Sequence, residues 1–141
     1  MKDNFVIQLV TWQTRASHLK KVREEVFIKE QHVPVELEWD GLDEAAQHLL
    51  ALSAAGEPIG CARLTGDGSI GRMAVLRPWR GLGVGRALLA KAVSLYREQG
   101  MEGITLSAQV YAIPFYEKSG FKHCSEPYLD ADILHIDMRL K

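Results

Sequence analysis

The chain of 141 residues has no long apolar run, and its charges are nearly balanced. None of its hydrophobic stretches approaches the roughly 18 residues of a membrane-spanning helix, and the first residues, Met1 to Asn4, lack the apolar segment of a signal peptide. Basic residues number 17 and acidic residues 18, whereas a nucleic-acid-binding domain normally shows a basic excess. We therefore expect a cytoplasmic protein that binds neither membranes nor nucleic acid.

Cysteines and paired metal ligands are scarce. The two cysteines, Cys61 and Cys124, fall in strand-like segments and form no C-x-x-C pair, so we expect reduced, buried thiols. The five histidines show no paired ligand spacing, so no metal is expected. Cys124 follows His123, but neighbours on a strand point to opposite faces, which disfavours a Cys/His nucleophile.

Repeats, low-complexity segments and flexible linkers are also absent. With 47% hydrophobic and 25% charged residues, a chain of this length can bury a single core. We therefore expect one domain that spans residues 1–141.

Hydrophobic periodicity predicts an α/β fold of the mixed α+β kind. Alternating segments indicate strands at residues 5–11, 48–54, 58–65, 69–75, 104–108, 121–125 and 132–140. Helical patterns run from a cap at Ser17 to about Glu30, near residues 43–47, from the loop at 80–86 to Gln99, and over 111–119. Short turns join the three strands between residues 48 and 75, which predicts an antiparallel meander.

A glycine-rich loop leads from the third strand of that meander into the longest helical pattern. It consists of Arg80, Gly81, Leu82, Gly83, Val84, Gly85 and Arg86. Glycines let the backbone turn tightly and approach a ligand, and the free N–H groups of a helix start attract anions. The loop therefore indicates a phosphate or pyrophosphate site; the structural alternative is a tight strand-to-helix connection.

Spacing excludes two common nucleotide loops. A Walker A loop needs Lys and Ser or Thr after its last glycine, but Arg86 and Ala87 follow Gly85. A dinucleotide fingerprint needs a small third residue, and the two possible registers place Arg86 or Leu88 there.

A second motif follows the helix: Ala112-Ile113-Pro114-Phe115-Tyr116-Glu117-Lys118-Ser119-Gly120-Phe121. Together with Arg80-x-x-Gly83-x-Gly85, it resembles the paired signatures of the GNAT superfamily of N-acetyltransferases, and the resemblance extends over essentially the whole chain. Further segments resemble a subgroup of small bacterial members, the YjcF/ElaA-like proteins, whose substrates are poorly defined. These segments are Val22-Arg23-x-x-Val26-Phe27, Glu30-Gln31-x-Val33-Pro34, Gly71-Arg72-Met73-Ala74-Val75, Ala108-Gln109 and His135-Ile136-x-Met138.

The resemblance implies a twisted, mostly antiparallel sheet of about seven strands with about four helices, splayed between its fourth and fifth strands. It also implies acetyl-CoA as co-substrate, with the pyrophosphate on the glycine loop and the pantetheine arm along the fourth strand. The residues that it assigns to the coenzyme outside the loop are Met73, Ala74, Val75, Gln109, Ala112, Phe115 and Tyr116. Gln109 stands where the family often has Asn, one methylene shorter.

Catalytic roles are also implied by the resemblance. Tyr116 matches the family's proton donor to the coenzyme sulfur; its alternative role is packing against the cofactor helix. A backbone N–H near Ala74 or Val75 would bind the oxyanion. The family has no universal base motif. The candidates are Glu30, Glu36, Glu38, His48 and His135, of which we favour Glu30 because it ends the first helix beside the acceptor cleft; for His48 a structural role is favoured.

The acceptor would be a small-molecule or peptidyl amine. Six acids and no Lys or Arg lie between Glu30 and Glu44, so this connection would attract a cationic amine, unless it is a solvated acidic loop. Trp39 in the same connection either walls the acceptor site or covers the core.

Many relatives dimerise, so a homodimer is compatible with the resemblance. The alternative to an N-acetyltransferase is a non-catalytic module that binds acyl-CoA and reports it to a partner.

Overall fold

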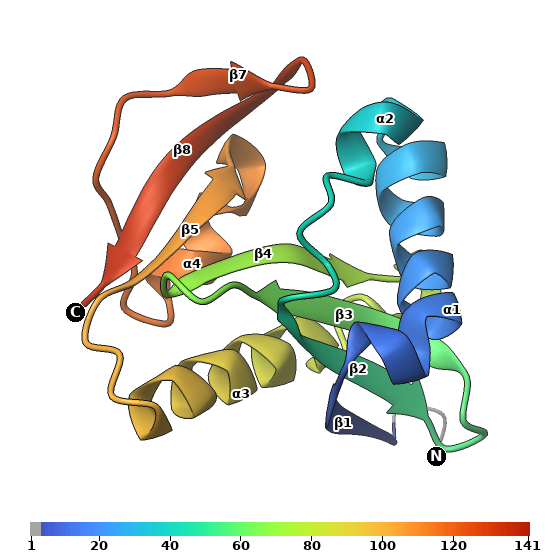
Figure 1. The fold of residues 1–141 in the computed structure, drawn as a ribbon. Coiled ribbons are helices and arrows are strands. Elements are labelled where there is room, and N and C mark those ends of the chain that lie inside the picture. Colours follow the sequence, from blue (N-terminus) through green and yellow to red (C-terminus); the bar gives the residue numbers. More distant parts are fainter. Residues whose placement is uncertain (1–3) are drawn as a thin grey trace.

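A mixed eight-stranded sheet runs through residues 4–141, the part of the chain that this computed structural model describes (Figure 1). The strand order is β1-β2-β3-β4-β5-β8-β6, with β7 also paired to β8. All pairs are antiparallel except β4 with β5. The strands are β1 Phe5–Val10, β2 Gln47–Ser53, β3 Pro58–Leu64, β4 Ser69–Val75, β5 Ile104–Gln109, β6 Lys122–His123, β7 Tyr128–Asp130 and β8 Ile133–Leu140.

Helices cover both faces of this sheet. The helices are α1 Trp12–Arg23, the π-helix η1 Glu24–Glu30, α2 Val35–Glu38, α3 Val84–Glu98, α4 Ile113–Glu117, and the 3₁₀ turns η2 Arg77–Trp79 and η3 Val110–Ala112. In Figure 1, α1 and α3 lie on different sides of β2, β3 and β4. The buried apolar residues accordingly form two clusters, a larger one around α3 and a smaller one around α1.

The packing of α3 follows directly from its sequence. Its apolar stripe, including Val84, Leu88 and Ala92, is fully buried. Gly60 of β3 makes room for it, because a Cβ there would lie 3.1 Å from Val84 Cγ1 and 3.2 Å from Leu88 Cδ1. The close approach fixes the start of α3, and with it the glycine loop, at the end of β4.

The sheet splays between β4 and β5, as the resemblance predicts. The parallel ladder joins only Ser69 to Thr105 and Ile70 to Leu106. In Figure 1 the two strands diverge beyond this point, so β5 and β8 form a separate wing. The later residues of β4 therefore present their backbone groups to the gap.

Several element predictions need correction at the N-terminal helix. It begins at Trp12, because Thr11 caps it by accepting a hydrogen bond from Thr14 N at 3.3 Å, and not at Ser17. Its last part is a π-helix, which hydrophobic spacing does not distinguish from an α-helix. The short helix in the acidic connection spans Val35–Glu38 and not residues 43–47.

The C-terminal hairpin and one cysteine also differ from prediction. Strand β7 was not predicted, because its turn to β8 uses Ala131 and Asp132 at positive φ, where such turns usually carry Asn-Gly or Asp-Gly. Cys61 is buried as predicted, but Cys124 is exposed, because it lies beyond the short strand β6.

In residues 4–141, no helix combines the length and apolar character required to cross a membrane.

Candidate active site

The glycine loop adopts the backbone that a phosphate site requires. Gly81 and Gly83 have φ of 79° and 90°, a region that L-residues rarely occupy, and Gly83 is the N-cap of α3. Gly85 lies against the second motif, because a Cβ there would be 3.4 Å from the ring of Phe115. The first N–H groups of α3 have no partner within the helix, so they are available to an anion.

Side chains of the loop divide into three kinds. Val84 is buried in the core, so only its backbone can reach a ligand. Leu82 is partly buried, and Arg86 is exposed in the first turn of α3. Arg80 is held by Val75 O, 2.9 Å from its Nε, and by both carboxylate oxygens of Glu30, each 2.7 Å from a terminal nitrogen. Its side chain therefore ties the loop to the protein.

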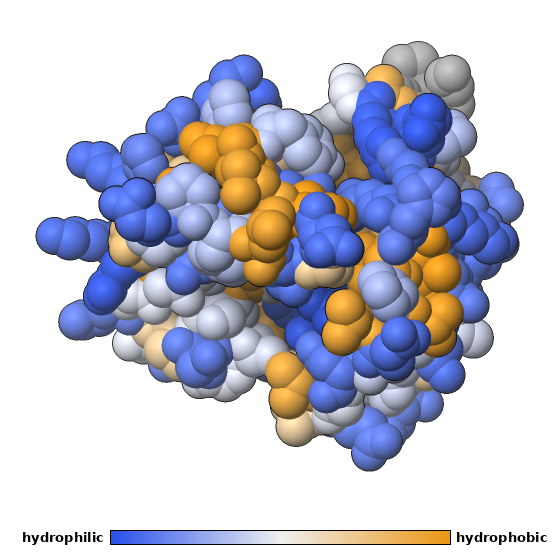
Figure 2. Space-filling view, turned by 90° about the horizontal axis from the view of Figure 1, so that it is seen from above, coloured by the Kyte–Doolittle hydropathy of each residue, from blue (hydrophilic) through white to orange (hydrophobic). Residues whose placement is uncertain are grey.

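The edge of β4 borders a cavity of about 210 Å³. Met73, Gln109, Ala112 and Tyr116, all expected at the coenzyme site, line it. Its walls come from η1 and α2 on one side and from the β7–β8 hairpin on the other, the two parts that face each other at the top of Figure 1. Figure 2 looks onto this face, where apolar patches alternate with polar surface. Segments distant in sequence thus meet at the gap in the sheet.

Tyr116 occupies the inner wall of the cavity. Its ring packs edge-on against Phe115 and Phe121, with centroids 5.0 and 6.2 Å away. Its hydroxyl lies 3.9 Å from Met73 Sδ. Burial, with a smaller contribution from Tyr111, raises the pKa of Tyr116 to about 12, so the phenol stays protonated at neutral pH. The hydroxyl of this half-buried tyrosine therefore lies beside a thioether sulfur.

Glu30, the favoured base candidate, is not among the residues that line the cavity. Both its oxygens bind Arg80, and Arg77 Nη2 lies 3.3 Å away. The hydrogen bond from Arg80 is the main cause that lowers the pKa of Glu30. A carboxylate stabilised in this way is a poor proton acceptor, so the geometry argues against Glu30 as the base.

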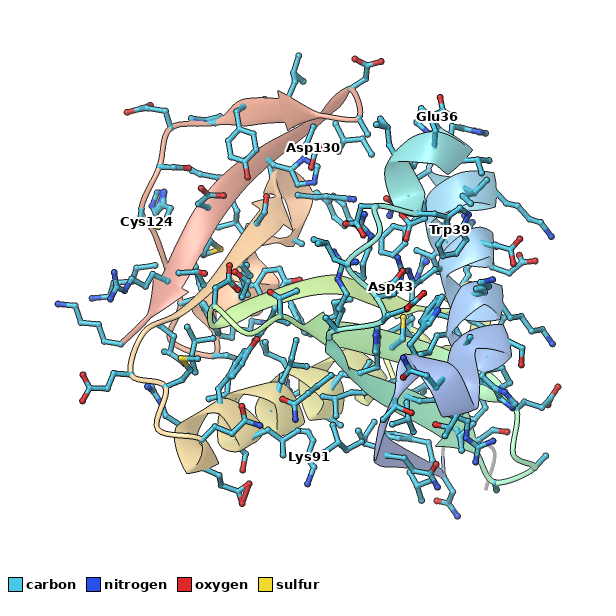
Figure 3. All side chains as sticks on the ribbon, in the orientation of Figure 1. Glu36, Trp39, Asp43, Lys91, Cys124 and Asp130 are labelled. Carbon is cyan, nitrogen blue, oxygen red and sulfur yellow. The ribbon has the colours of Figure 1, made fainter. Side chains whose placement is uncertain are left out.

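Three other base candidates are also poorly placed, two because they are bonded elsewhere and one because it is exposed away from the cavity lining. Glu38 lines the cavity but is 2% exposed and accepts a 2.8 Å hydrogen bond from Arg23. His48 is buried, with Nε2 2.8 Å from Asp43 O, and burial lowers its pKa. That contact supports the structural role favoured for His48. Glu36 points outward at the end of α2 (Figure 3).

His135 remains, and it lines the cavity opposite η1. Its Nδ1 lies 2.7 Å from Ile133 O. Because a carbonyl oxygen only accepts, this contact requires a proton on Nδ1, which leaves the lone pair of the neutral ring on Nε2. Tyr128 stacks on the imidazole with centroids 6.1 Å apart. The ring is therefore oriented by two contacts.

The acidic connection is largely neutralised, which counters the expected attraction of a cationic acceptor. Arg23 donates to Glu38 and to Asp43, at 2.8 and 2.6 Å. Arg63 donates to Asp40 at 2.8 Å and to Asp43 at 3.1 Å. With Glu30 on Arg80, four of the six acids have arginine partners. The arginines that pair with these acids belong to other elements of the fold, so the spacing of the acids within residues 30–44 does not predict the pairs.

Trp39 covers this network and is absent from the cavity lining. The guanidinium carbon of Arg23 lies 4.9 Å from the centroid of the Trp39 ring. In Figure 3, Trp39 and Asp43 are both seen beside α1, whereas Asp130 lies across the gap near the β7–β8 hairpin. Trp39 therefore packs on the buried ion pairs of Arg23 and does not line the cavity.

Arg72 is a site residue that sequence reasoning missed. It lines the cavity, has a φ of 47° and lies at an irregularity in the β3–β4 ladder. Its Nε is 3.0 Å from Glu38 Oε2, and its Nη2 donates to Leu37 O at 3.2 Å, so it joins β4 to α2. A non-glycine residue in this conformation is strained, and only three-dimensional contacts reveal it. Gln31, which was quoted only as part of a motif, also lines the cavity.

Comparison with known proteins agrees with this geometry. Residues 15–141 match the family model described as acetyltransferase (GNAT) domain. The chain is 39% identical over 121 residues to the uncharacterized N-acetyltransferase YjcF of Bacillus subtilis, a match that covers 83% of this chain and 86% of the relative.

Two solved structures are similar over nearly their whole length. An acyl-CoA N-acyltransferase from Pseudomonas aeruginosa has a TM-score of 0.83 and 31% identity, with 96% of this chain and 97% of that chain covered. Escherichia coli ElaA has a TM-score of 0.86 and 26% identity, with 98% and 100% covered.

Proposed function

Because the chain belongs to the GNAT family of acyltransferases, we propose that it transfers the acetyl group of acetyl-CoA to a primary amine. The amine attacks the thioester directly while both substrates are bound. One observation carries the proposal: the half-buried side chain of Tyr116 and the open edge of β4 border the same cavity.

The coenzyme would follow the open edge of β4. Its pyrophosphate would accept hydrogen bonds from the N–H groups after Gly83, where the helix dipole also favours an anion. Its pantetheine amides would pair with backbone groups of Met73, Ala74 and Val75, which lie beyond the last β4–β5 pair at Ile70. An N–H of Ala74 or Val75 would then donate to the oxyanion of the tetrahedral intermediate.

Tyr116 would protonate the departing thiolate. A thiol has an ordinary pKa near 8.5, lower than that of a phenol, so driving force alone does not favour this transfer. Burial raises the pKa of Tyr116 to about 12 and makes the phenol a weaker acid still, so the transfer would depend on short-range geometry. The Tyr116 hydroxyl lies 3.9 Å from Sδ of Met73 on β4, the strand that would hold the pantetheine arm.

His135 would receive the proton of the amine. An alkylamine with an ordinary pKa of about 10.4 is almost entirely protonated at pH 7, so a base must accept a proton before or during attack. Nε2 of His135 carries the lone pair when Nδ1 donates to Ile133 O. Of the five base candidates, His135 lines the cavity without an arginine partner within residues 4–141.

The acceptor proposed here is a small-molecule or peptidyl primary amine. A cationic preference no longer follows from the acids between Glu30 and Glu44, since arginines neutralise most of them. Selectivity would instead arise at the cavity mouth, where Leu37 and Tyr111 are 50% and 77% exposed.

The test combines coenzyme binding with catalysis. Thiol release from acetyl-CoA is measured across a panel of primary amines for the wild type, Tyr116→Phe and His135→Gln. Each variant should lose about a hundredfold or more in kcat, as expected when a general acid or base is removed. Coenzyme A should bind both variants as it binds the wild type, by calorimetry.

Two outcomes would contradict the proposal. Binding of coenzyme A without amine-dependent thiol release would favour the alternative, a non-catalytic acyl-CoA sensor. Full activity of Tyr116→Phe would reduce Tyr116 to a packing residue against the cofactor helix.

A further inference from the structure

Glu30 and Gln31 end the π-helix η1 over the gap in the sheet, and their side chains contact opposite sides of it. Glu30 holds Arg80 of the glycine loop. Gln31 accepts a 2.7 Å hydrogen bond from Nε2 of Gln109, the last residue of β5. The backbone permits this because η1 is wound as a π-helix, with Gln31 N bonded to Val26 O.

The Glu30–Arg80 pair joins η1 to the end of β4 and to the start of the glycine loop. Arg80 Nε donates to Val75 O at the end of β4, and its two terminal nitrogens donate to Glu30. The guanidinium is thus bonded on both sides, by strand β4 and by η1, directly before Gly81. A bidentate pair of this kind fixes an orientation as well as a distance. Glu30 therefore helps to fix the position of Arg80, the first residue of the glycine loop.

The charged side chains around Glu30 leave a net positive charge, which favours an anion. Arg77 and Arg80 both lie within 3.3 Å of the single carboxylate of Glu30. Glu30 neutralises one of the two positive charges and leaves the other for an incoming phosphate. Without Glu30 the two arginines would repel each other, and Arg80 would lose the two hydrogen bonds that hold it to η1.

We propose that Glu30 is a positioning residue for the coenzyme, acting through Arg80 to set the loop that receives the pyrophosphate, and that it takes no part in proton transfer. The inference rests on the proposed function, because it assumes that coenzyme A occupies this loop. It assigns Glu30 to coenzyme binding instead of acid–base chemistry.

The experiment compares Glu30→Gln with a matched control, Glu25→Gln. Glu25 lies in the same π-helix and also has a cationic partner, Lys29 Nζ at 2.9 Å, but it is remote from the loop. Glu30→Gln should raise the Kd for coenzyme A about tenfold, whereas Glu25→Gln should bind like the wild type. Arg80→Gln should show the same loss, and adding Glu30→Gln to it should bring little more, since both changes remove one interaction.

A second acyl donor separates positioning from catalysis. S-acetylpantetheine lacks the pyrophosphate, so the kcat/KM of Glu30→Gln with this donor should equal that of the wild type. With acetyl-CoA the variant should show a raised KM and a retained kcat. Glu30→Asp, which keeps the charge, should recover part of the coenzyme affinity.

Three results would overturn the inference. Wild-type or tighter affinity of Glu30→Gln for coenzyme A would show that the carboxylate is irrelevant to the loop or competes with the phosphate. A loss of kcat with both donors at unchanged coenzyme affinity would restore Glu30 as the base. Wild-type protein that binds no coenzyme A would refute the proposed function itself, and this inference with it.

Discussion

Gly83 is the residue on which the glycine loop depends most directly. It combines a φ of 90° with the N-cap position of α3, and a Cβ there would meet no other atom within 4 Å. A side chain at this position is therefore disfavoured by backbone strain and not by crowding within the protein; in the proposed function it would also enter the space of the pyrophosphate. A substitution at Gly83 should therefore change two measurable quantities, the free energy of unfolding and the affinity for coenzyme A.

Gly83→Ala should lose about 1–2 kcal/mol of unfolding free energy, because an L-residue is strained at this φ. It should also weaken coenzyme A binding about tenfold or more, since the methyl group enters the anion site. Gly41→Ala is the control: Gly41 has a φ of 82° and equally open surroundings, but it lies in the α2–β2 connection. It should show the same loss in chemical denaturation and unchanged coenzyme affinity. Equal affinity of the two variants would contradict a phosphate site at Gly83.

At the scale of elements, ion pairs join α1, the acidic connection, β3 and β4. Arg23, Arg63 and Arg72 supply three positive charges, and Glu38, Asp40 and Asp43 supply three negative ones. The net charge of this group is zero, which lets it be largely buried. Because Arg72 also lines the cavity, the network connects the fold of the first half of the chain to the site.

Glu38→Gln should lose about 3–5 kcal/mol of unfolding free energy, since it removes one of the two carboxylates that pair with the buried Arg23 and leaves the three arginines of the network with only two negative charges. Urea denaturation measures the loss. Lys29→Met, which breaks the exposed pair with Glu25 on the same helical region, should change stability within experimental error. Similar small effects of both substitutions would mean that the buried network contributes little to stability.

At the scale of the whole molecule, the network makes stability depend on acid pH. Burial opposes the charge of Asp40, but hydrogen bonds from Arg63 and from Leu42 N outweigh it and lower the pKa of Asp40 from 3.8 to about 2. The folded state therefore binds fewer protons than the unfolded chain between these two values. This contribution to stability is fully present above about pH 4 and is lost as the pH falls toward 2.

Asp40→Asn should consequently flatten the acid side of the stability curve. The unfolding free energy of the wild type should fall more between pH 5 and pH 3 than that of the variant, while the variant should be less stable at pH 7. Denaturant titrations at a series of pH values measure both. Parallel curves for the two proteins would show that Asp40 is not stabilised by its arginine neighbours.

Much of the fold and of the coenzyme site follows from local sequence. Glycines at 81, 83 and 85, the apolar stripe from Val84 to Tyr96 and the motif around Tyr116 each act over a few residues, so their order and spacing predict the loop, the helix and the aromatic wall. Strand β7 was missed because its turn carries Ala131 and Asp132, which give no ordinary turn signal.

The surroundings of the base candidates and of the acidic connection depend on tertiary structure. The sequence left both Glu30 and His135 as base candidates, with Glu30 favoured, but Arg80, fifty residues from Glu30 in the chain, binds Glu30 and lowers its pKa. Most of the negative charge between Glu30 and Glu44 is likewise compensated by arginines of α1, β3 and the loop. The ionisation of a side chain depends on which charges the fold places within a few ångströms of it, and those partners come from distant parts of the sequence.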